Sequence, residues 1–121
     1  MVERATIPLM AATTPPEVTV VDEPGRQRFE IRVDGELAGF TEYRRSPGLI
    51  AFIHTLIDPR FEGQGLGTRL VTDALSRVRA DGLAVLPFCP FARAFIANHT
   101  DEYLDLVPEA YRSEFGLPAN G

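Results

Sequence analysis

The chain has 121 residues, a length that predicts one domain with an ordinary hydrophobic core. Its net charge of −5 argues against nucleic-acid binding, and no apolar run approaches the roughly 18 residues that a membrane helix needs. One cysteine excludes a disulfide framework and a cysteine-based zinc site, and residues 1–4 lack the pattern of a secretory signal, so we expect a cytoplasmic protein without a metal.

The first elements are predicted to be a tail and two strands. Residues 1–16 show no periodicity and end in a proline pair, which is typical of a flexible N-terminal tail. Residues 17–21 alternate in part and predict a short strand, which is followed by a turn at 23–25. Charged and apolar residues alternate over 28–33, the pattern of a half-buried antiparallel strand.

A hairpin and a fourth strand come next. The Asp34-Gly35 pair predicts a tight turn, so residues 37–45 are the return strand. After a turn at 46–48, residues 49–57 are nearly all apolar, and we expect this strand to be covered on both faces.

The second half of the chain predicts a helix, a strand and a helix. Apolar residues recur at helical spacing at Leu66, Leu70, Val71, Ala74, Leu75 and Val78. Gly82 is suited to cap that helix. Residues 83–86 form a short buried strand, residues 87–90 break it, and residues 91–99 predict a second helix.

The order of these elements predicts the fold class. A short helix around 108–111 and a C-terminal tail at 116–121 complete the chain, so the domain spans residues 17–115. Four meandering strands followed by helix, strand and helix indicate an α+β fold, with helices packed on a mostly antiparallel sheet. A right-handed crossover would place the fifth strand parallel to the fourth.

A run of glycines separates the fourth strand from the first helix. Gly63, Gly65 and Gly67 alternate with other residues and lead directly into the helical pattern. Such a loop is either an ordinary turn or a set of free N–H groups at a helix N-terminus, where the helix dipole also favours an anion. The spacing is not the dinucleotide fingerprint, and the chain has no lysine for a Walker A loop. The run therefore predicts a different phosphate-bearing ligand.

The loop resembles a known pyrophosphate loop, that of the GNAT superfamily of N-acetyltransferases, whose pattern is Gln/Arg-x-x-Gly-x-Gly/Ala. The match begins at the fourth position, and Glu62 stands where the family has Gln or Arg. With His54-Thr55, Cys89-Pro90-Phe91 and residues 99–103, the chain is similar over residues 17–107 to the small YjdJ-type subgroup. The resemblance implies a minimal GNAT-like fold with a twisted sheet and two main helices.

The resemblance also implies acetyl-CoA as cofactor and an unidentified amine as acceptor, while the charge and the lack of a long apolar run argue against a nucleic-acid or membrane partner. The residues expected to bind the cofactor are Leu56, Ile57, Gly63, Gln64, Gly65, Leu66, Gly67, Thr68, Cys89, Phe91 and Phe95. Loop N–H groups would hold the pyrophosphate, and backbone groups of the fourth strand would pair with the pantetheine arm. The two phenylalanines would cover that arm. The oligomeric state stays open.

Three side chains are candidates for the chemistry. His54, which alternation places on the same face as Phe52 and Leu56, is a general base or a satisfied core histidine. Cys89 lies where a helix dipole favours the thiolate, and it is an acetyl-accepting nucleophile, a group beside the thioester or a buried packing residue. Tyr103 protonates the departing CoA thiolate, as in related enzymes, or anchors the tail.

Several assignments stay open at this point. Leu56 stands where the subgroup often has glutamate, so Glu42 and Asp58 are alternative bases. His99 is suited to cap the second helix, and the acidic residues after it are solvated surface or attract a cationic acceptor. The favoured function is an N-acetyltransferase with direct transfer rather than an acyl-enzyme on Cys89. The alternatives are a non-catalytic CoA-binding or regulatory module and an unrelated nucleotide-phosphate binder.

Overall fold

The computed structural model describes residues 15–120, so most of the predicted N-terminal tail lies outside the described residues. The described elements are β1 (Val18–Glu23), β2 (Arg28–Val33), β3 (Glu36–Ser46), β4 (Leu49–Ile57), α2 (Leu66–Ala80), β5 (Ala84–Pro87), α3 (Pro90–Ala97) and α4 (Thr100–Tyr103). Short 3₁₀ turns connect several of these elements and fill much of the segment after α4. The predicted domain limits of 17 and 115 stay a prediction.

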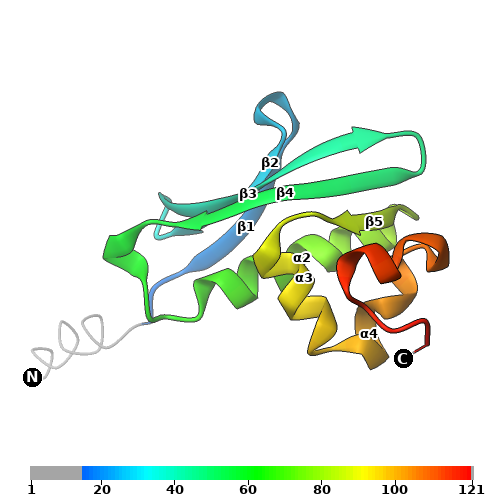
Figure 1. Ribbon diagram of the computed structural model, residues 1–121. Coiled ribbons are helices and arrows are strands. Elements are labelled where there is room, and N and C mark those ends of the chain that lie inside the picture. Colours follow the sequence, from blue (N-terminus) through cyan, green and yellow to red (C-terminus); the bar gives the residue numbers. More distant parts are fainter. Residues whose placement is uncertain (1–14, 121) are drawn as a thin grey trace, which may run out of the picture.

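The strands form one five-stranded sheet in the order β1-β2-β3-β4-β5. Neighbouring strands are antiparallel except β4 and β5, which are parallel because α2 crosses between them. Figure 1 shows the helices gathered on one side of this sheet, so the described residues place no helix on its other face, which is called the open face below. The predicted α+β fold, with its parallel fourth and fifth strands, is confirmed.

The core lies between the sheet and the helices. Six residues of α2 are buried, namely Leu66, Leu70, Val71, Ala74, Leu75 and Val78, and they are the six that the periodicity indicates. They pack with sheet residues such as Phe29 and Phe52 and with C-terminal residues that include Leu117. No helix within residues 15–120 has the length and apolar character needed to cross a membrane.

The element boundaries differ slightly from those expected. Strand β1 extends to Glu23 because it pairs with β2 along its whole length, whereas the local alternation fades after Val21. Helix α3 ends at Ala97, and His99 caps it, since its ring nitrogen Nδ1 lies 2.8 Å from the carbonyl oxygen of Phe95. The short helix α4 was not predicted.

A β-bulge in β4 corrects the predicted position of His54. Glu42 of β3 pairs with His54 while Tyr43 pairs with Phe52, so Ile53 is an extra residue. The bulge reverses the alternation, and Phe52 packs in the core whereas His54 lies against Phe40 on the open face. The prediction that Phe52, His54 and Leu56 share one face is therefore wrong.

The prediction that the fourth strand is covered on both faces is also wrong for its second half. Phe52 is buried at 2% exposure, but Ile53, His54 and Leu56 are exposed. The helices cover only one face of the sheet, and the pairing with β5 ends at Phe52. The second half of this apolar run therefore lies at the protein surface, and no second layer of helices within residues 15–120 covers it.

Candidate active site

Strands β4 and β5 separate halfway along β4. Their pairing ends at Phe52 and Pro87, and the main-chain N–H of Cys89 then donates to the carbonyl oxygen of Phe52 over 2.8 Å. Beyond this point β4 continues through residues 53–57, and no strand within residues 15–120 pairs with it on that side. This edge offers backbone donors and acceptors to an extended ligand, in the manner of an added strand. The predicted Leu56 and Ile57 both lie on it.

The glycine loop presents a row of unpaired donors at the start of α2. None of the N–H groups of residues 63–68 has an acceptor within residues 15–120. Gly63 and Gly65 have φ angles of 83° and 73°, which side chains other than glycine adopt at a cost. Gly65 is the N-cap and supplies no side chain to satisfy these groups. The local geometry is that of an anion site.

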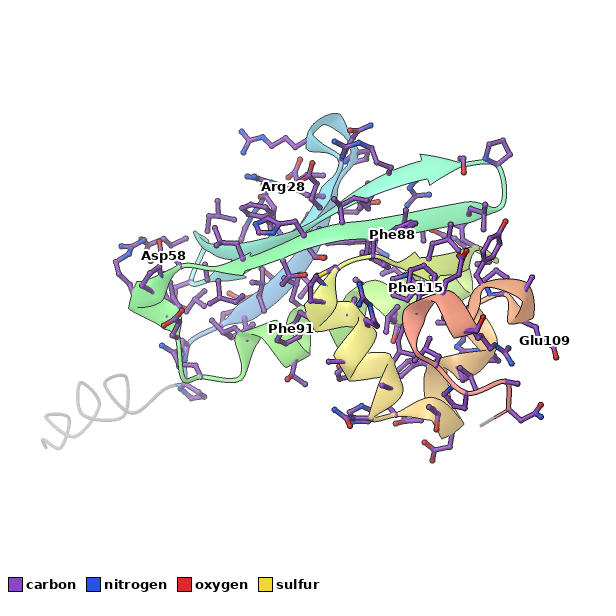
Figure 2. The ribbon with its side chains drawn as sticks, viewed as in Figure 1. Arg28, Asp58, Phe88, Phe91, Glu109 and Phe115 are labelled. Atoms are coloured by element: carbon purple, nitrogen blue, oxygen red, sulfur yellow. The ribbon has the colours of Figure 1, made fainter. Side chains whose placement is uncertain are left out.

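Phe91 explains the third glycine of the loop. A Cβ atom built on Gly67 would lie 2.9 Å from the ring of Phe91, so an alanine here would force the ring to move. Figure 2 labels Phe91 on the first turn of α3, which lies beside the start of α2. The ring is 42% exposed, and such an exposed aromatic side chain beside free N–H groups is suited to cover a ligand.

Two cavities of similar size meet at Phe91. One, of about 260 Å³, is lined by Ile57, Phe61, Glu62, Gly63, Gly65, Leu66, Gly67, Thr68 and Phe91. The other, of about 270 Å³, is lined by Thr68, Phe91, Ala94, Phe95, Asn98 and His99. Eight of the predicted cofactor residues line one or both of these cavities, namely Ile57, Gly63, Gly65, Leu66, Gly67, Thr68, Phe91 and Phe95. Leu56, Gln64 and Cys89 line neither of them. Nothing in the structure explains the carboxylate of Glu62 at the first cavity.

Cys89 is the N-cap of α3 and lies at the point where β4 and β5 separate. Its side chain is buried, at 1% exposure. Its Sγ atom lies 3.0 Å from Oγ1 of Thr55, which in turn lies 2.9 Å from Oγ1 of Thr41. Sequence analysis singled out Cys89 but missed both threonines. Simple alternation from Phe52 would turn Thr55 away from the core, and it is the bulge at Ile53 that brings Thr55 to Cys89.

His54 lies on the open face of the sheet. Its ring makes an edge contact with Phe40, with centroids 6.1 Å apart, and Glu42 is its cross-strand neighbour. Glu42 is paired with Arg44 at 3.0 Å. Successive side chains of a strand point to opposite faces, so His54 and Thr55 lie at the same point along β4 but on opposite faces of the sheet.

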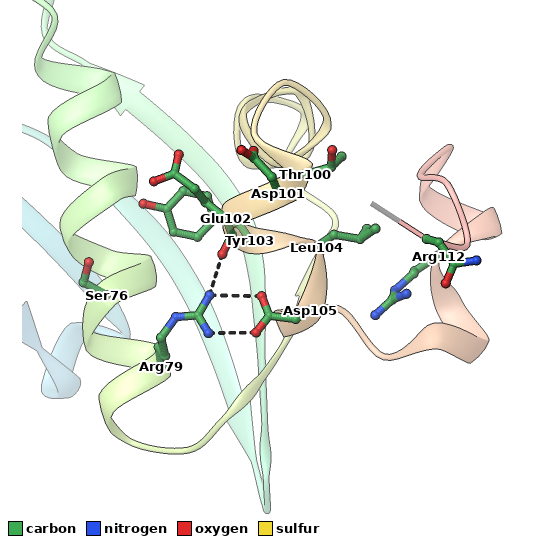
Figure 3. Close-up of a pocket in the computed structure, with 10 residues that line it drawn as sticks. Ser76, Arg79, Thr100, Asp101, Glu102, Tyr103, Leu104, Asp105 and Arg112 are labelled. Atoms are coloured by element: carbon green, nitrogen blue, oxygen red, sulfur yellow. Dashed lines mark hydrogen bonds and ion pairs between the residues drawn. The ribbon is translucent and has the colours of Figure 1, made fainter.

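Tyr103 lies away from the glycine loop. It packs against Phe95, with ring centroids 5.5 Å apart, and it lines a polar cavity of about 750 Å³ that shares no lining residue with the two cavities at the loop. Figure 3 shows Arg79 in this cavity, paired with both oxygens of Asp105 and with the carbonyl oxygen of Glu102. The hydrogen bonds from Arg79 lower the pKa of Asp105 below its usual value.

A metal centre has no support in the described part of the chain, where no three His, Cys, Asp or Glu side chains gather in a way that holds an ion. The site is instead a groove with free N–H groups at one end and an unpaired strand edge along it. These features suit a long ligand that carries phosphates and amides.

Comparison with known proteins agrees with this geometry. The family model described as GCN5-related N-acetyl-transferase matches residues 28–106, which is most of the chain and includes the strand edge, the glycine loop and α3. No curated protein matches the chain significantly.

Proposed function

The chain belongs to the GCN5-related N-acetyltransferase family, and on that premise we propose that it transfers an acetyl group from acetyl-CoA to an amine. The observation that carries the proposal is the row of N–H groups at residues 63–68, which have no acceptor within the described residues and lie next to the unpaired edge of β4. Acetyl-CoA supplies the acetyl group as an activated thioester and carries the phosphates that such a loop attracts.

The loop and the strand edge divide the binding of the cofactor between them. The N–H groups of Gly63, Gln64, Gly65, Leu66, Gly67 and Thr68 would hold the pyrophosphate. No arginine among the described residues lines this cavity, so backbone donors and the dipole of α2 would provide the attraction. Backbone groups of Leu56 and Ile57 would pair with the pantetheine amides, and Phe91 and Phe95 would cover the ligand.

Acceptor chemistry is assigned to the open face of the sheet. His54 is exposed there and is the proposed general base, acting through water, with Glu42 as its cross-strand neighbour. Proximity of amine and thioester supplies much of the acceleration. Tyr103, the predicted proton donor, lines another cavity, and its role stays a prediction.

Direct transfer is favoured over an acetyl-enzyme on Cys89. The thiol is 1% exposed, so an acetyl group on Sγ would have no open space to occupy in the close-packed core. Intact-mass measurement after incubation with acetyl-CoA should therefore show no added acetyl group. An acetyl adduct on Cys89 that disappears when an amine is added would establish the acyl-enzyme instead.

A thiol-release assay with acetyl-CoA and a panel of amines tests the proposed reaction. We expect CoA release that depends on at least one amine and falls about 100-fold in His54→Ala, the lower end of the usual contribution of a general base. The variant Arg77→Ala, on the exposed side of α2, is the matched control.

The second candidate function is a non-catalytic CoA-binding or regulatory module. It is favoured by Leu56, an exposed apolar side chain at the position where related chains often carry a carboxylate base. Tight binding of acetyl-CoA with no amine-dependent release of CoA would support this function and contradict the first.

A further inference from the structure

Three groups that can donate and accept hydrogen bonds lie in series on the core side of the sheet. Thr41 of β3 contacts Thr55 of β4, and Thr55 contacts Cys89 at the start of α3, at 2.9 Å and 3.0 Å. Thr41 is 1% exposed and Cys89 is 1% exposed. Each group carries one hydrogen, so two hydrogens fill the two contacts and the third is left over.

The series has three arrangements, and only one of them suits an ionised sulfur. In the first, Cys89 donates to Thr55 and Thr55 donates to Thr41. In the second, Thr41 donates to Thr55 and Thr55 donates to Sγ, which frees the S–H hydrogen of Cys89 from any acceptor in the series. In the third, Thr55 accepts from both neighbours and its own hydrogen lies outside the series. A thiolate can only accept, so it requires the second arrangement.

We infer that Thr55 is a positioning residue for Cys89, which it holds as a proton donor beside the acyl group. This inference rests on the proposed function, because it needs a thioester bound where β4 and β5 separate. Thr55, held by Thr41, donates to Sγ and leaves the S–H hydrogen free of the series, at the point where β4 and β5 separate.

The proton balance of the step closes without any further reagent. The amine nitrogen bonds to the acetyl carbon, the bond between that carbon and the CoA sulfur breaks, and the CoA sulfur takes the proton of Cys89. The amine proton leaves through water to His54. Cys89 is then a thiolate that accepts from Thr55, and solvent returns its proton and removes the one on His54. No bond forms between Cys89 and the acetyl group.

Other ionisable groups of the surrounding elements do not account for this role. His54 and Glu42 lie on the opposite face of the sheet. Arg93, one turn along α3, directs its guanidinium to the carbonyl oxygens of Pro87 and Phe88. The side chains that α2 turns toward the core are apolar. Among residues 15–120, Thr55 is the hydrogen-bond partner of the thiol.

The test uses the single cysteine of the chain as its own reporter. The rate of alkylation of the free protein by iodoacetamide is followed by intact mass across pH. The plateau at high pH reports how accessible the thiol is, and the midpoint of the profile reports how strongly the protein favours the thiolate. A merely structural role of Thr55 would change the plateau and leave the midpoint where it was.

Four threonine variants separate the hydroxyl from the shape of the side chain. Thr55→Val keeps the branched shape and should raise the midpoint by about one pH unit, whereas Thr55→Ser should keep it. Thr41→Val should give a smaller rise in the same direction, and it also serves if Thr55→Val does not fold. Thr19→Val, on the exposed side of β1, is the matched control.

Steady-state kinetics complete the test. Thr55→Val should lower kcat about tenfold with little change in the KM for acetyl-CoA, and Thr55→Ser should restore kcat. Equal midpoints in all variants, or Thr55→Ser as slow as Thr55→Val, would overturn the inference. Failure of the wild-type protein to bind acetyl-CoA would instead contradict the proposed function, and the alkylation profile would still report on the threonines.

Discussion

Glycine is required at position 67 because of a neighbouring side chain and not because of the backbone conformation. It lies in the first turn of α2, where glycine is less favourable than alanine by up to about 1 kcal/mol. The ring of Phe91 nevertheless occupies the place of its missing Cβ, at 2.9 Å. A methyl group would displace the ring that closes the loop cavity.

Gly67→Ala should therefore weaken acetyl-CoA binding about tenfold, or 1.4 kcal/mol, without lowering the melting temperature. Calorimetric titration and thermal unfolding measure the two effects. Gly25→Ala is the matched control, since nothing lies within 4 Å of a Cβ there. Unchanged affinity in Gly67→Ala would show that Phe91 takes no part in the site.

Glu30 is a buried carboxylate on the otherwise open face of the sheet. Its side chain is 3% exposed, and it is bonded to Arg28 at 2.7 Å and to Arg32 at 2.8 Å. Burial by itself raises the pKa of Glu30, but the hydrogen bonds and charges of Arg32 and Arg28 outweigh burial, so the pKa lies below its usual value. A carboxyl group with a lowered pKa in the fold stabilises the protein above its unfolded pKa, and this contribution disappears as the pH falls through the folded pKa.

Glu30→Gln should lower the free energy of unfolding by about 2 kcal/mol at pH 7, and the deficit should shrink below about pH 4. Urea denaturation at both pH values measures it. Glu36→Gln, which removes an exposed ion pair with Arg60, should change stability by less than about 0.5 kcal/mol. A deficit that is the same at pH 7 and pH 3 would contradict the ionic account of Glu30.

Helix α4 is too short to be stable alone, so its position depends on its contacts. Arg79 of α2 binds both oxygens of Asp105, at 2.8 Å and 3.0 Å, and also the carbonyl oxygen of Glu102. Leu104 and Leu106 are buried beside these contacts. A planar guanidinium donates from two terminal nitrogens at once, so it can bind both carboxylate oxygens and a carbonyl oxygen, whereas all donors of an ammonium group are on one nitrogen.

Arg79→Lys should consequently lower the free energy of unfolding by about 1 kcal/mol, and Arg77→Lys on the same helix should be neutral. Hydrogen exchange of residues 100–106 offers a local readout, and it should accelerate in Arg79→Lys alone. Equal exchange in both variants would mean that apolar packing suffices to hold α4.

Sequence patterns predicted the elements that have a clear period. Helix α2 and strand β2 follow from apolar positions spaced 3.6 and 2 residues apart, and each of the expected apolar positions of α2 is buried. Helix α4 has only four residues, and its tertiary contacts with Arg79 override any local signal.

The bulge at Ile53 could not be read from the sequence, because an apolar run has no alternation to interrupt. It decides which candidate residues meet. Strict alternation from Phe52 would place His54 on the core face and Thr55 on the open face. The bulge reverses this, so Thr55 contacts Cys89 while His54 is exposed. The position of the glycine loop was predictable because the end of one strand and the start of the next helix both leave a local signal in the sequence.

Residues 15–120 combine a small, mostly antiparallel sheet with a single helical layer, and these residues leave one face of β3 and β4 open beside the candidate site. The glycine loop lies at one end of the β4 edge and Cys89 at the point where β5 leaves it. A phosphate-bearing ligand anchored at the loop would thus have its far end near Cys89, with His54 on the acceptor side.

Calorimetric titration with acetyl-CoA and with acetyl-pantetheine tests this central claim most directly, because the second ligand has the same thioester but no phosphates. Binding of one acetyl-CoA per chain is expected, with acetyl-pantetheine at least about tenfold weaker, since the loop N–H groups would have no anion to hold. Equal affinity for the two ligands, or tighter binding of ATP than of acetyl-CoA, would contradict the assignment of residues 63–68 as the pyrophosphate site.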